Sequence, residues 1–273
     1  IAALSIGLRA LPATPRSQHP FDFVSAILNA LTFGLVISGI DGIGHGASWP
    51  SVAARIGAGL LFGALLVRRQ FKLPSPLLPV DLLRIPIFAL SVSTSTCSFA
   101  AQMLAYVSLP FYLHDVLGRS AVETGLLMTP WPLLVGVAAP LAGRLADRYP
   151  AGLLGGIGLA VFAVGLSLLA LLPAAPADTD IAWRMAVCGF GFGLFQSPNN
   201  RTIMGSAPRE RSGGASGMLG TARLAGQTLG AALVALIFGV TASSAATIAL
   251  TLAAGFAAVA AVISSLRLLA PTN

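Results

Sequence analysis

A single arginine interrupts a long run of small and apolar residues, and it raises the first chemical question of this sequence. The stretch ASGMLGTARLAGQTLGAAL at 215–233 holds Arg223 near its middle, 11 residues after Ser212. A helix that starts at Ser212 would place Arg223 about 16 Å along its axis. In a membrane, a central guanidinium costs at least about 2.5–3.5 kcal/mol. The sequence therefore predicts that Arg223 faces a polar interior or a cavity.

Arg223 shares its predicted helical face with other polar or small residues. Gln227 follows one turn later, and Ser216, Gly220 and Gly230 lie on the same side. None of the nine acidic residues is expected at the depth of Arg223. Its partner is therefore predicted to be an amide or a carbonyl of this chain, a residue outside this sequence, or a bound substrate. A cavity-lining or coupling role is favoured, with a structural tie as the alternative.

Two further segments carry similar polar stripes, at steps of three and four residues. The stripes consist of Ser91, Ser95, Ser98, Gln102 and Tyr106 in the first segment, and of Gly189, Gly193, Gln196 and Asn200, with Asn199 adjacent, in the second. Packing between helices is the favoured interpretation for the glycines and serines. For the four amides, packing and a water-filled cavity are equally compatible with the pattern.

A short charged loop, GRLADRYP at 143–150, is the second feature with chemical potential. Asp147 precedes an apolar run, where its carboxylate could cap the free N–H groups at the start of a helix. Arg144 and Arg148 would hold the loop at the cytoplasmic side of a membrane. From the residues alone, a capped turn is the favoured interpretation.

The elements that carry these residues are predicted to be transmembrane helices. Of the 273 residues, 56% are hydrophobic and 9% are charged, whereas a soluble domain has about 25% charged residues. Because a spanning helix needs about 20 apolar residues, the apolar runs predict eight spans, at 22–40, 50–67, 87–113, 123–143, 150–172, 181–201, 212–237 and 244–266. Pro130 and Pro132 should kink the fourth span, and Pro198 should interrupt the sixth.

The spans fall into groups along the chain. Residues 1–21 are interpreted as the tail of a preceding span and a linker, 22–67 as two helices, 68–86 as a connector, and 87–273 as a bundle of six spans. The sequence opens on Ile1 without a signal-peptide pattern, so we expect it to be part of a longer protein.

The net charge of +7 follows a membrane pattern rather than a nucleic-acid-binding one. If the segment before the first complete span is cytoplasmic, twelve of the sixteen basic residues lie in cytoplasmic segments. This is the positive-inside distribution. It predicts a multi-pass protein of the plasma membrane, in contact with the lipid bilayer, with residues 1–21 and the C-terminus in the cytoplasm.

The sequence offers little for catalysis or cofactor binding. His19, His45 and His114 lie in loops or at span ends, and Cys97 and Cys188 fall inside spans. No His/Cys spacing indicates a metal site, and no GxxxxGK[ST] loop indicates nucleotide binding. We therefore expect no cofactor and no enzyme, and an ATP-driven permease would need a separate nucleotide-binding subunit.

Two groups of residues resemble the major facilitator superfamily. The Gly-x-Leu-Ala-Asp-Arg loop at 143–148 resembles the loop signature of that family. The run GLLMTP at 125–130 and the stretch GFGFGLFQSPNNRTIMGSAPRERSGGASGMLGTARLAGQTLGAAL at 189–233 are similar to spans of its fourteen-span drug:proton antiporters. The resemblance implies an all-α polytopic membrane fold, in which two extra transmembrane helices precede the C-terminal six-helix half.

The same resemblance implies a role for the charged loop. It would form a latch that opens and closes during alternating access, made of Gly143, Arg144, Asp147 and Arg148. Leu153 and Leu154 stand where the family pattern has further basic residues, which predicts a weaker latch.

The implied function is secondary active transport, namely proton-coupled efflux of drugs or other small hydrophobic or cationic molecules. A direct proton carrier needs a titratable group, and no acid or histidine is expected inside the membrane, so proton coupling should depend on a missing N-terminal half. The candidate cavity or coupling residues are Arg223, Gln227, Gln196, Asn199, Asn200, Gln102 and Tyr106. The alternatives are a half-transporter fragment without independent activity and a structural or binding membrane subunit.

Overall fold

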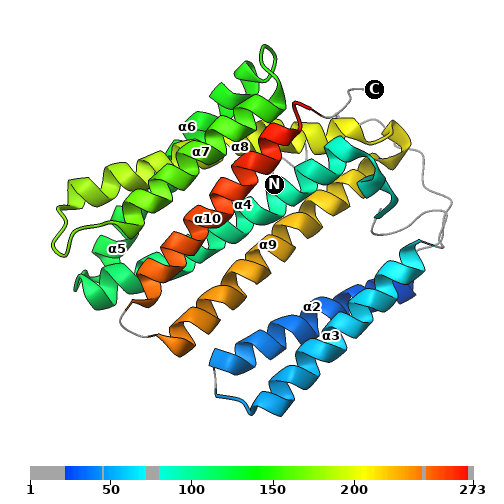
Figure 1. The fold of residues 1–273 in the computed structure, drawn as a ribbon, viewed down its shortest axis with the longest axis horizontal. Helices are drawn as coiled ribbons and strands as arrows, with labels where there is room; N and C mark the ends of the chain where they lie inside the picture. Colours follow the sequence, from blue (N-terminus) through cyan, green and yellow to red (C-terminus); the bar gives the residue numbers. More distant parts are fainter. Residues whose placement is uncertain (1–21, 45, 72–79, 242–243, 270–273) are drawn as a thin grey trace, which may run out of the picture.

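The chain is built from long helices. The computed structural model describes residues 22–44, 46–71, 80–241 and 244–269, and these residues contain no strand. Figure 1 shows the helices lying side by side. The all-α prediction is confirmed for this part of the chain, while residues 1–21, the predicted tail of a preceding span and its linker, lie outside it.

The helices follow the predicted spans closely. The first two, α2 (Phe23–Gly44) and α3 (Trp49–Gln70), form a hairpin. The remaining elements, in chain order, are η1 (Val80–Arg84), α4 (Pro86–Phe111), η2 (Tyr112–Val116), α5 (Ala121–Met128), α6 (Pro130–Leu145), α7 (Ala151–Ala170), α8 (Asp178–Ser206), η3 (Arg209–Arg211), α9 (Ser212–Val240) and α10 (Ala245–Leu266). The short η1 and η3 are 3₁₀ helices, and η2 is a π-helical turn that follows α4.

Seven helical stretches in the described residues are long and apolar enough to cross a membrane. One of them, Ala121–Leu145, combines α5 and α6. Helix α8 contains the predicted span 181–201 but is not among the seven, although it has 29 residues. Its amides and charges lower its hydropathy, yet it packs against both α6 and α7. The eighth crossing therefore stays a prediction.

The two predicted proline sites differ in their effect. The helix breaks between α5 and α6 at Thr129, directly before Pro130, as the pattern predicts. The hydroxyl of Thr129 donates a hydrogen bond of 2.8 Å to the carbonyl of Gly125, which also accepts one from the backbone N–H of Thr129. Pro198, in contrast, stands inside the continuous helix α8, so the prediction that it interrupts the helix is wrong.

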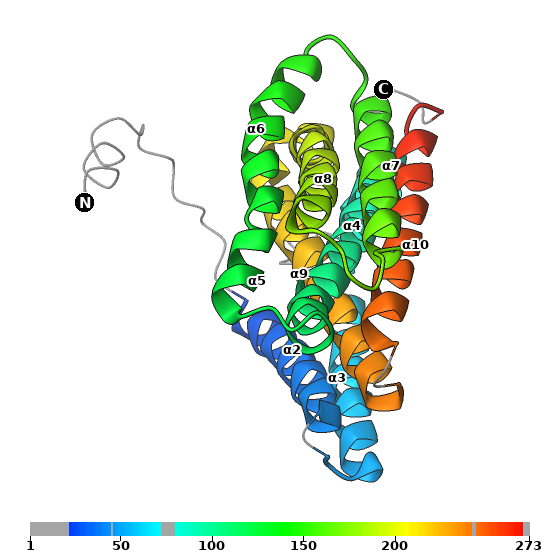
Figure 2. The same cartoon turned by 90° about the vertical axis from the view of Figure 1, so that its left-hand side faces the viewer.

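Six of the predicted spans pack into one bundle. Helix α6 contacts α8, α8 contacts α7, α7 contacts α10, α10 contacts α4, and α4 contacts α9. Helices α4 and α8, which carry two of the polar stripes, also contact each other. The α2–α3 hairpin lies at the side of this bundle, where α2 packs against α9 (Figures 1 and 2).

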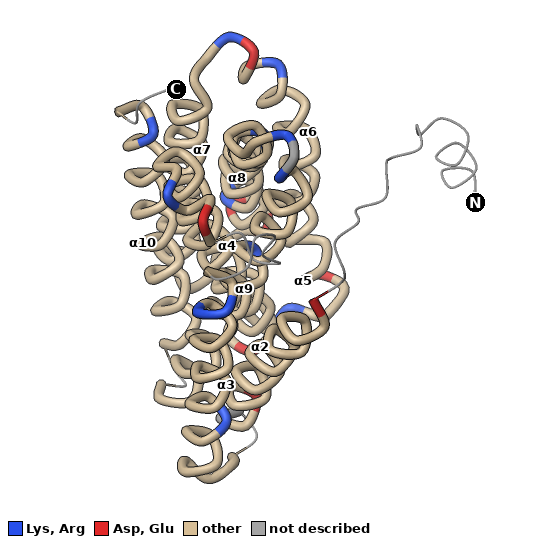
Figure 3. Tube along the Cα trace, turned by 90° about the vertical axis from the view of Figure 1, so that its right-hand side faces the viewer, with Lys and Arg blue, Asp and Glu red and all other residues tan. Residues whose placement is uncertain are grey.

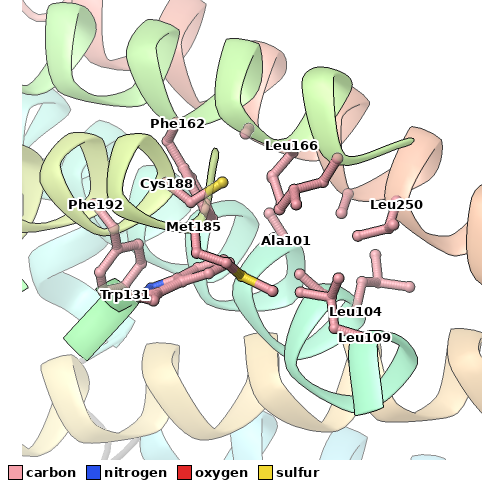
Figure 4. Close-up of a cluster of buried hydrophobic side chains, with 14 of the residues drawn as sticks. Ala101, Leu104, Leu109, Trp131, Phe162, Leu166, Met185, Cys188, Phe192 and Leu250 are labelled. Atoms are coloured by element: carbon pink, nitrogen blue, oxygen red, sulfur yellow. The ribbon is translucent and has the colours of Figure 1, made fainter. Parts of the chain in front are cut away.

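Aromatic and aliphatic side chains fill the centre of the bundle (Figure 4). The ring of Phe162 on α7 lies between those of Trp131 on α6 and Phe192 on α8, with centroid distances of 5.5 Å to each. Both contacts are edge-to-face, an arrangement that aromatic pairs favour. Because lipid tails are as apolar as these side chains, close packing rather than the hydrophobic effect holds such helices together.

Glycines mark the closest approaches between helices. A Cβ on Gly189 of α8 would clash with the carbonyl oxygen of Trp131, and one on Gly226 of α9 would clash with that of Thr96. The packing interpretation is therefore confirmed for Gly189. Gly220, from the predicted stripe on α9, faces open space, and a Cβ there would have nothing within 4 Å.

Substitution of Gly226 by alanine should destabilise the bundle, because the new methyl group would clash with the α4 backbone. Overpacking of this kind costs about 1–3 kcal/mol. Gly220→Ala on the same helix is the matched control, since it gains the same helix propensity without a clash. The thermal unfolding temperature in detergent is the measurement. Equal unfolding temperatures for the two variants would show that α9 does not pack so closely on α4.

Candidate functional site

Charged residues lie mainly near the ends of the helices and in the connections between them (Figure 3). Arg223 is an exception, since it lies within the long helix α9 and is exposed on its surface. The Cζ atom of Arg223 lies 5.3 Å from the ring centroid of Phe99 on α4. Such cation–π contacts contribute about 0.5–2 kcal/mol. Within the described residues Arg223 has no carboxylate partner.

Phe99 is the partner that the described residues provide for the charge of Arg223. The prediction that no acid of this chain neutralises Arg223 agrees with the described ion pairs. An aromatic partner was not predicted, because Phe99 lies far from Arg223 in sequence and no periodic pattern links the two. The Cζ atom lies over the Phe99 ring, and the N–H groups of the guanidinium have no hydrogen-bond partner among the described residues.

Gln227 lies one turn from Arg223 and lines a pocket of about 250 Å³ between the hairpin and the bundle. The pocket wall combines residues of α2, α4 and α9, namely Ile37, Ile40, Met103, Leu224, Gln227, Thr228 and Ala231. The amide of Gln227 and the hydroxyl of Thr228 are the polar groups in an otherwise apolar lining. Of the face of α9 that the sequence predicts to be polar, Gln227 therefore borders an open space, while Gly230 packs against the α4 backbone.

Gln102 and Tyr106 are half-buried on α4. The ring of Tyr106 lies 4.8 Å from that of Trp131, measured between centroids. Trp131 is fully buried, and its indole Nε1 has no hydrogen-bond partner in the described part of the chain. The Tyr106 side chain therefore packs onto the aromatic core. The side-chain amide of Gln102 makes no hydrogen bond to the described residues.

Asn199 is the most buried of the predicted candidates, with 0% of its surface exposed. Its Nδ2 donates to the hydroxyl of Ser95 at 2.7 Å and to the carbonyl of Ser91 at 3.4 Å. These bonds join α8 to α4, so Asn199 serves contacts between helices. Gln196 and Asn200 are half-buried and have no side-chain hydrogen bond to the described residues, so packing and a cavity both remain compatible with them.

Arg267 completes the polar group around Asn199. Its Nη1 donates to Oδ1 of Asn199 at 2.8 Å and to the hydroxyl of Ser91 at 3.2 Å, and its Nε donates to the carbonyl of Ser264 at 3.2 Å. Arg267 follows the last apolar run, where the sequence pattern indicates only a cytoplasmic charge. The structure buries it, with 4% of its surface exposed.

The predicted latch loop makes a different contact from the one expected. Asp147 pairs with Arg201 on α8 through an Oδ1–Nη1 distance of 2.6 Å. The prediction that Asp147 caps the next helix is wrong, because Pro150 precedes α7 and no side chain caps it. Arg201 was missed as a partner, although it directly ends an uncharged run in the sequence.

The other latch residues lie around this ion pair. Arg144 and Arg148 are exposed, and Gly143 is half-buried. A Cβ on Gly143 would lie 4.0 Å from the hydroxyl of Ser197 on α8, so the loop passes close to that helix. We call the end of the bundle that holds this loop, together with Arg267, the latch end.

Further ion pairs stabilise the helix ends. Asp81 pairs with Arg211 at 3.0 Å, which connects η1 to η3. Asp22 pairs with Arg69 at 3.1 Å across the α2–α3 hairpin. Hydrogen bonds from the hydroxyl and the backbone N–H of Ser25, and then the pairing with Arg69, lower the pKa of Asp22 to about 2. This carboxylate therefore stays charged, and the hairpin tie stays intact, until the pH falls well below 4.

Comparisons with known proteins identify the family. The model of the Major Facilitator Superfamily matches residues 23–231, more than half of the chain. The chain belongs to the Major Facilitator Superfamily. It is thus part of a polytopic membrane transporter and not of an enzyme, as the resemblance implies.

Individual relatives carry different names. The chain is 58% identical over 275 residues to the uncharacterized transporter YebQ of Escherichia coli (strain K12), with 100% of this chain and 60% of YebQ covered. It is 28% identical to the multidrug efflux pump LfrA of Mycolicibacterium smegmatis, with 86% of this chain and 47% of LfrA covered. It is 26% identical to the riboflavin transporter RibZ of Clostridioides difficile, with 87% of this chain and 52% of RibZ covered. The chain thus spans about half to three fifths of these relatives.

Loss of the Asp147–Arg201 pair should change transport more than stability. Both side chains are about two-thirds exposed, at 63% and 66%, and exposed pairs contribute about 0–1 kcal/mol. We expect Asp147→Asn and Arg201→Gln each to lower the transport rate, with little change in unfolding temperature. The double variant should be no worse than either single variant, since both remove the same contact. Additive losses in the double variant would contradict a shared role.

Proposed function

We propose that this chain forms part of a secondary active transporter that exports small hydrophobic or cationic molecules by alternating access, driven by proton entry. The observation that carries the proposal is the Asp147–Arg201 pair, which connects the α6–α7 loop to α8 within a chain of this superfamily. The name of LfrA, a multidrug efflux pump, supports export of drugs. RibZ, a riboflavin transporter, is a reminder that related chains differ in cargo.

The cavity is proposed to lie against the polar faces of α4, α8 and α9. Gln102, Gln196 and Asn200 offer amide groups that no described residue occupies with a hydrogen bond. Gln227 borders the pocket beside α2. Arg223, beside the ring of Phe99, offers N–H groups that have no hydrogen-bond partner among the described residues. These side chains would orient polar groups of a substrate, while the apolar surfaces around them would accept its rings or chains.

Proton coupling is proposed to depend on residues outside this chain. Asp115, Glu123 and Asp147 typify its acidic residues, which lie in connections or near helix ends rather than in the middle of a span. Arginine does not deprotonate in proteins, so Arg223 is not a proton carrier. The carboxylates that exchange protons, and the opposite wall of the cavity, would belong to an N-terminal half. The membrane is proposed to be the bacterial inner membrane, with the latch end in the cytoplasm.

Transport by the complete gene product tests this function. The protein is reconstituted in proteoliposomes with an imposed pH gradient, and movement of a hydrophobic fluorescent cation is recorded. Export that collapses when a protonophore removes the gradient is the expected result. Residues 1–273 alone should show no proton-coupled transport, and such transport by this segment would contradict the dependence on an N-terminal half.

Replacement of Arg223 by alanine should impair transport more than it impairs expression. Its charge lies on an exposed face, so few packing contacts are lost. Arg209→Ala, an exposed arginine in η3, is the matched control for the loss of one positive charge. The ratio of transport rate to protein in the membrane is the measurement. A normal ratio for Arg223→Ala would reduce Arg223 to a surface contact of Phe99.

A further inference from the structure

Arg267 is a buried cation whose described hydrogen-bond acceptors are all neutral. Two of them are side-chain oxygens of Asn199 and Ser91, and two are the carbonyl and the hydroxyl of Ser264. Burial of a charge is costly unless hydrogen bonds replace the lost water. Four acceptors around one guanidinium therefore form a specific site for Arg267 and not an incidental contact.

The surroundings of Arg267 connect four helices. Asn199 belongs to α8, Ser91 to α4, and Ser264 to α10. The hydroxyl of Ser264 also donates to the carbonyl of Gly152 on α7 at 3.1 Å. A Cβ on Gly155 would lie 2.6 Å from Nη2 of Arg267, so the glycine on α7 leaves the space that the guanidinium occupies. The site thus joins α4, α7, α8 and α10 at the latch end.

Asn199 occupies a position on α8 from which movement could be controlled. It directly follows Pro198, where the helix lacks one backbone donor, and it precedes Arg201 of the latch pair by two residues. Prolines are the usual points at which helices bend. The turns of α8 after Pro198 are therefore held from the inside by Arg267 and from the outside by Asp147.

We propose that Arg267 is a positioning residue of the transport cycle. Through Asn199 it holds the end of α8 against α4 and so keeps the seam between these helices closed at the latch end. This proposal rests on the transporter function proposed above. Because the acceptors are neutral, the seam can open without separating a buried ion pair. The hydrogen bonds of Arg267 can therefore hold α8 against α4 and still break during the transport cycle.

Cysteine labelling measures whether the seam is open. Gln196 lies one turn from Asn199, deeper in the bundle and half-buried, so a Gln196→Cys reporter reacts when the seam opens. Cys97 and Cys188 are first replaced by alanine in the complete gene product. A membrane-impermeant maleimide is applied to inside-out vesicles, where a cytoplasmic latch end is accessible.

Arg267→Met should raise the labelling rate of this reporter by about tenfold, the factor that corresponds to loss of one hydrogen bond to a charged group. The labelling rate of Arg267→Lys should lie between those of the unmodified protein and of Arg267→Met, because an ammonium can bind some of the acceptors but lacks the guanidinium fork. Arg209→Met removes an exposed positive charge near the latch end and should leave the rate unchanged. An unchanged rate in folded Arg267→Met would overturn the proposal.

Ser264→Ala tests the same tie from α10 and does not depend on Arg267→Met folding. It removes one acceptor of the guanidinium and leaves the bonds of Asn199 to Ser91 and Ser95 in place, so labelling should be faster than in the unmodified protein and slower than in Arg267→Met, with the maximal transport rate changed at unchanged KM. Unchanged or slower labelling in this variant would contradict the proposal. Labelling needs no substrate, so a response of the reporter without export of the tested dye would refute the proposed cargo and leave the role of Arg267 standing.

Discussion

The interior of a bilayer offers no hydrogen-bond partner, so every polar group that enters it must find one within the protein. This constraint explains the helical fold and also the serines and threonines of α4. The hydroxyls of Ser91, Thr94 and Ser108 donate to carbonyls one turn earlier, at 2.6–2.7 Å. A polar stripe of such residues therefore needs no water-filled cavity. Amide and guanidinium groups are not satisfied so locally, so they need partners on other helices, in water or in a substrate.

Arg267 and Arg223 meet this constraint in different ways. Arg267 directs its N–H groups at neutral oxygens of three helices and is almost fully buried. Arg223 has its Cζ atom over the ring of Phe99, and its N–H groups have no hydrogen-bond partner among the described residues. A guanidinium whose N–H groups are bound to acceptors on several helices fixes those helices relative to one another. A guanidinium without such acceptors can still donate hydrogen bonds to another molecule. The first arrangement suits a positioning role and the second suits contact with a substrate or with another part of the transporter.

Hydropathy and charge were enough to predict the helices, because long uncharged runs have few alternatives to spanning helices. The break before Pro130 was predictable for the same local reason. The contacts of Arg223, Arg201 and Arg267 were not predictable, since they involve partners on other helices or, for Arg201, in the α6–α7 loop; Asn199 and Arg267, for instance, are 68 residues apart. The expected cap by Asp147 failed because Pro150 directly precedes α7, and Asp147 instead pairs with Arg201 on α8. Local patterns identify which residues are polar, and only packing decides which of them meet.

The Asp147–Arg201 pair and the contacts of Arg267, both at the latch end, differ in how strongly water weakens them. The Asp147–Arg201 pair is short but about two-thirds exposed, so solvent competes with it and salt screens it. The contacts of Arg267 with Asn199 and Ser264 are shielded from water, and loss of either partner would leave buried polar groups unpaired. An exposed pair can therefore exchange rapidly without holding the helices, while the buried contacts set the free energy of the closed seam. If the loop acts as the predicted latch, it needs both kinds of contact, because the exposed pair exchanges quickly and only the buried contacts would hold the helices together.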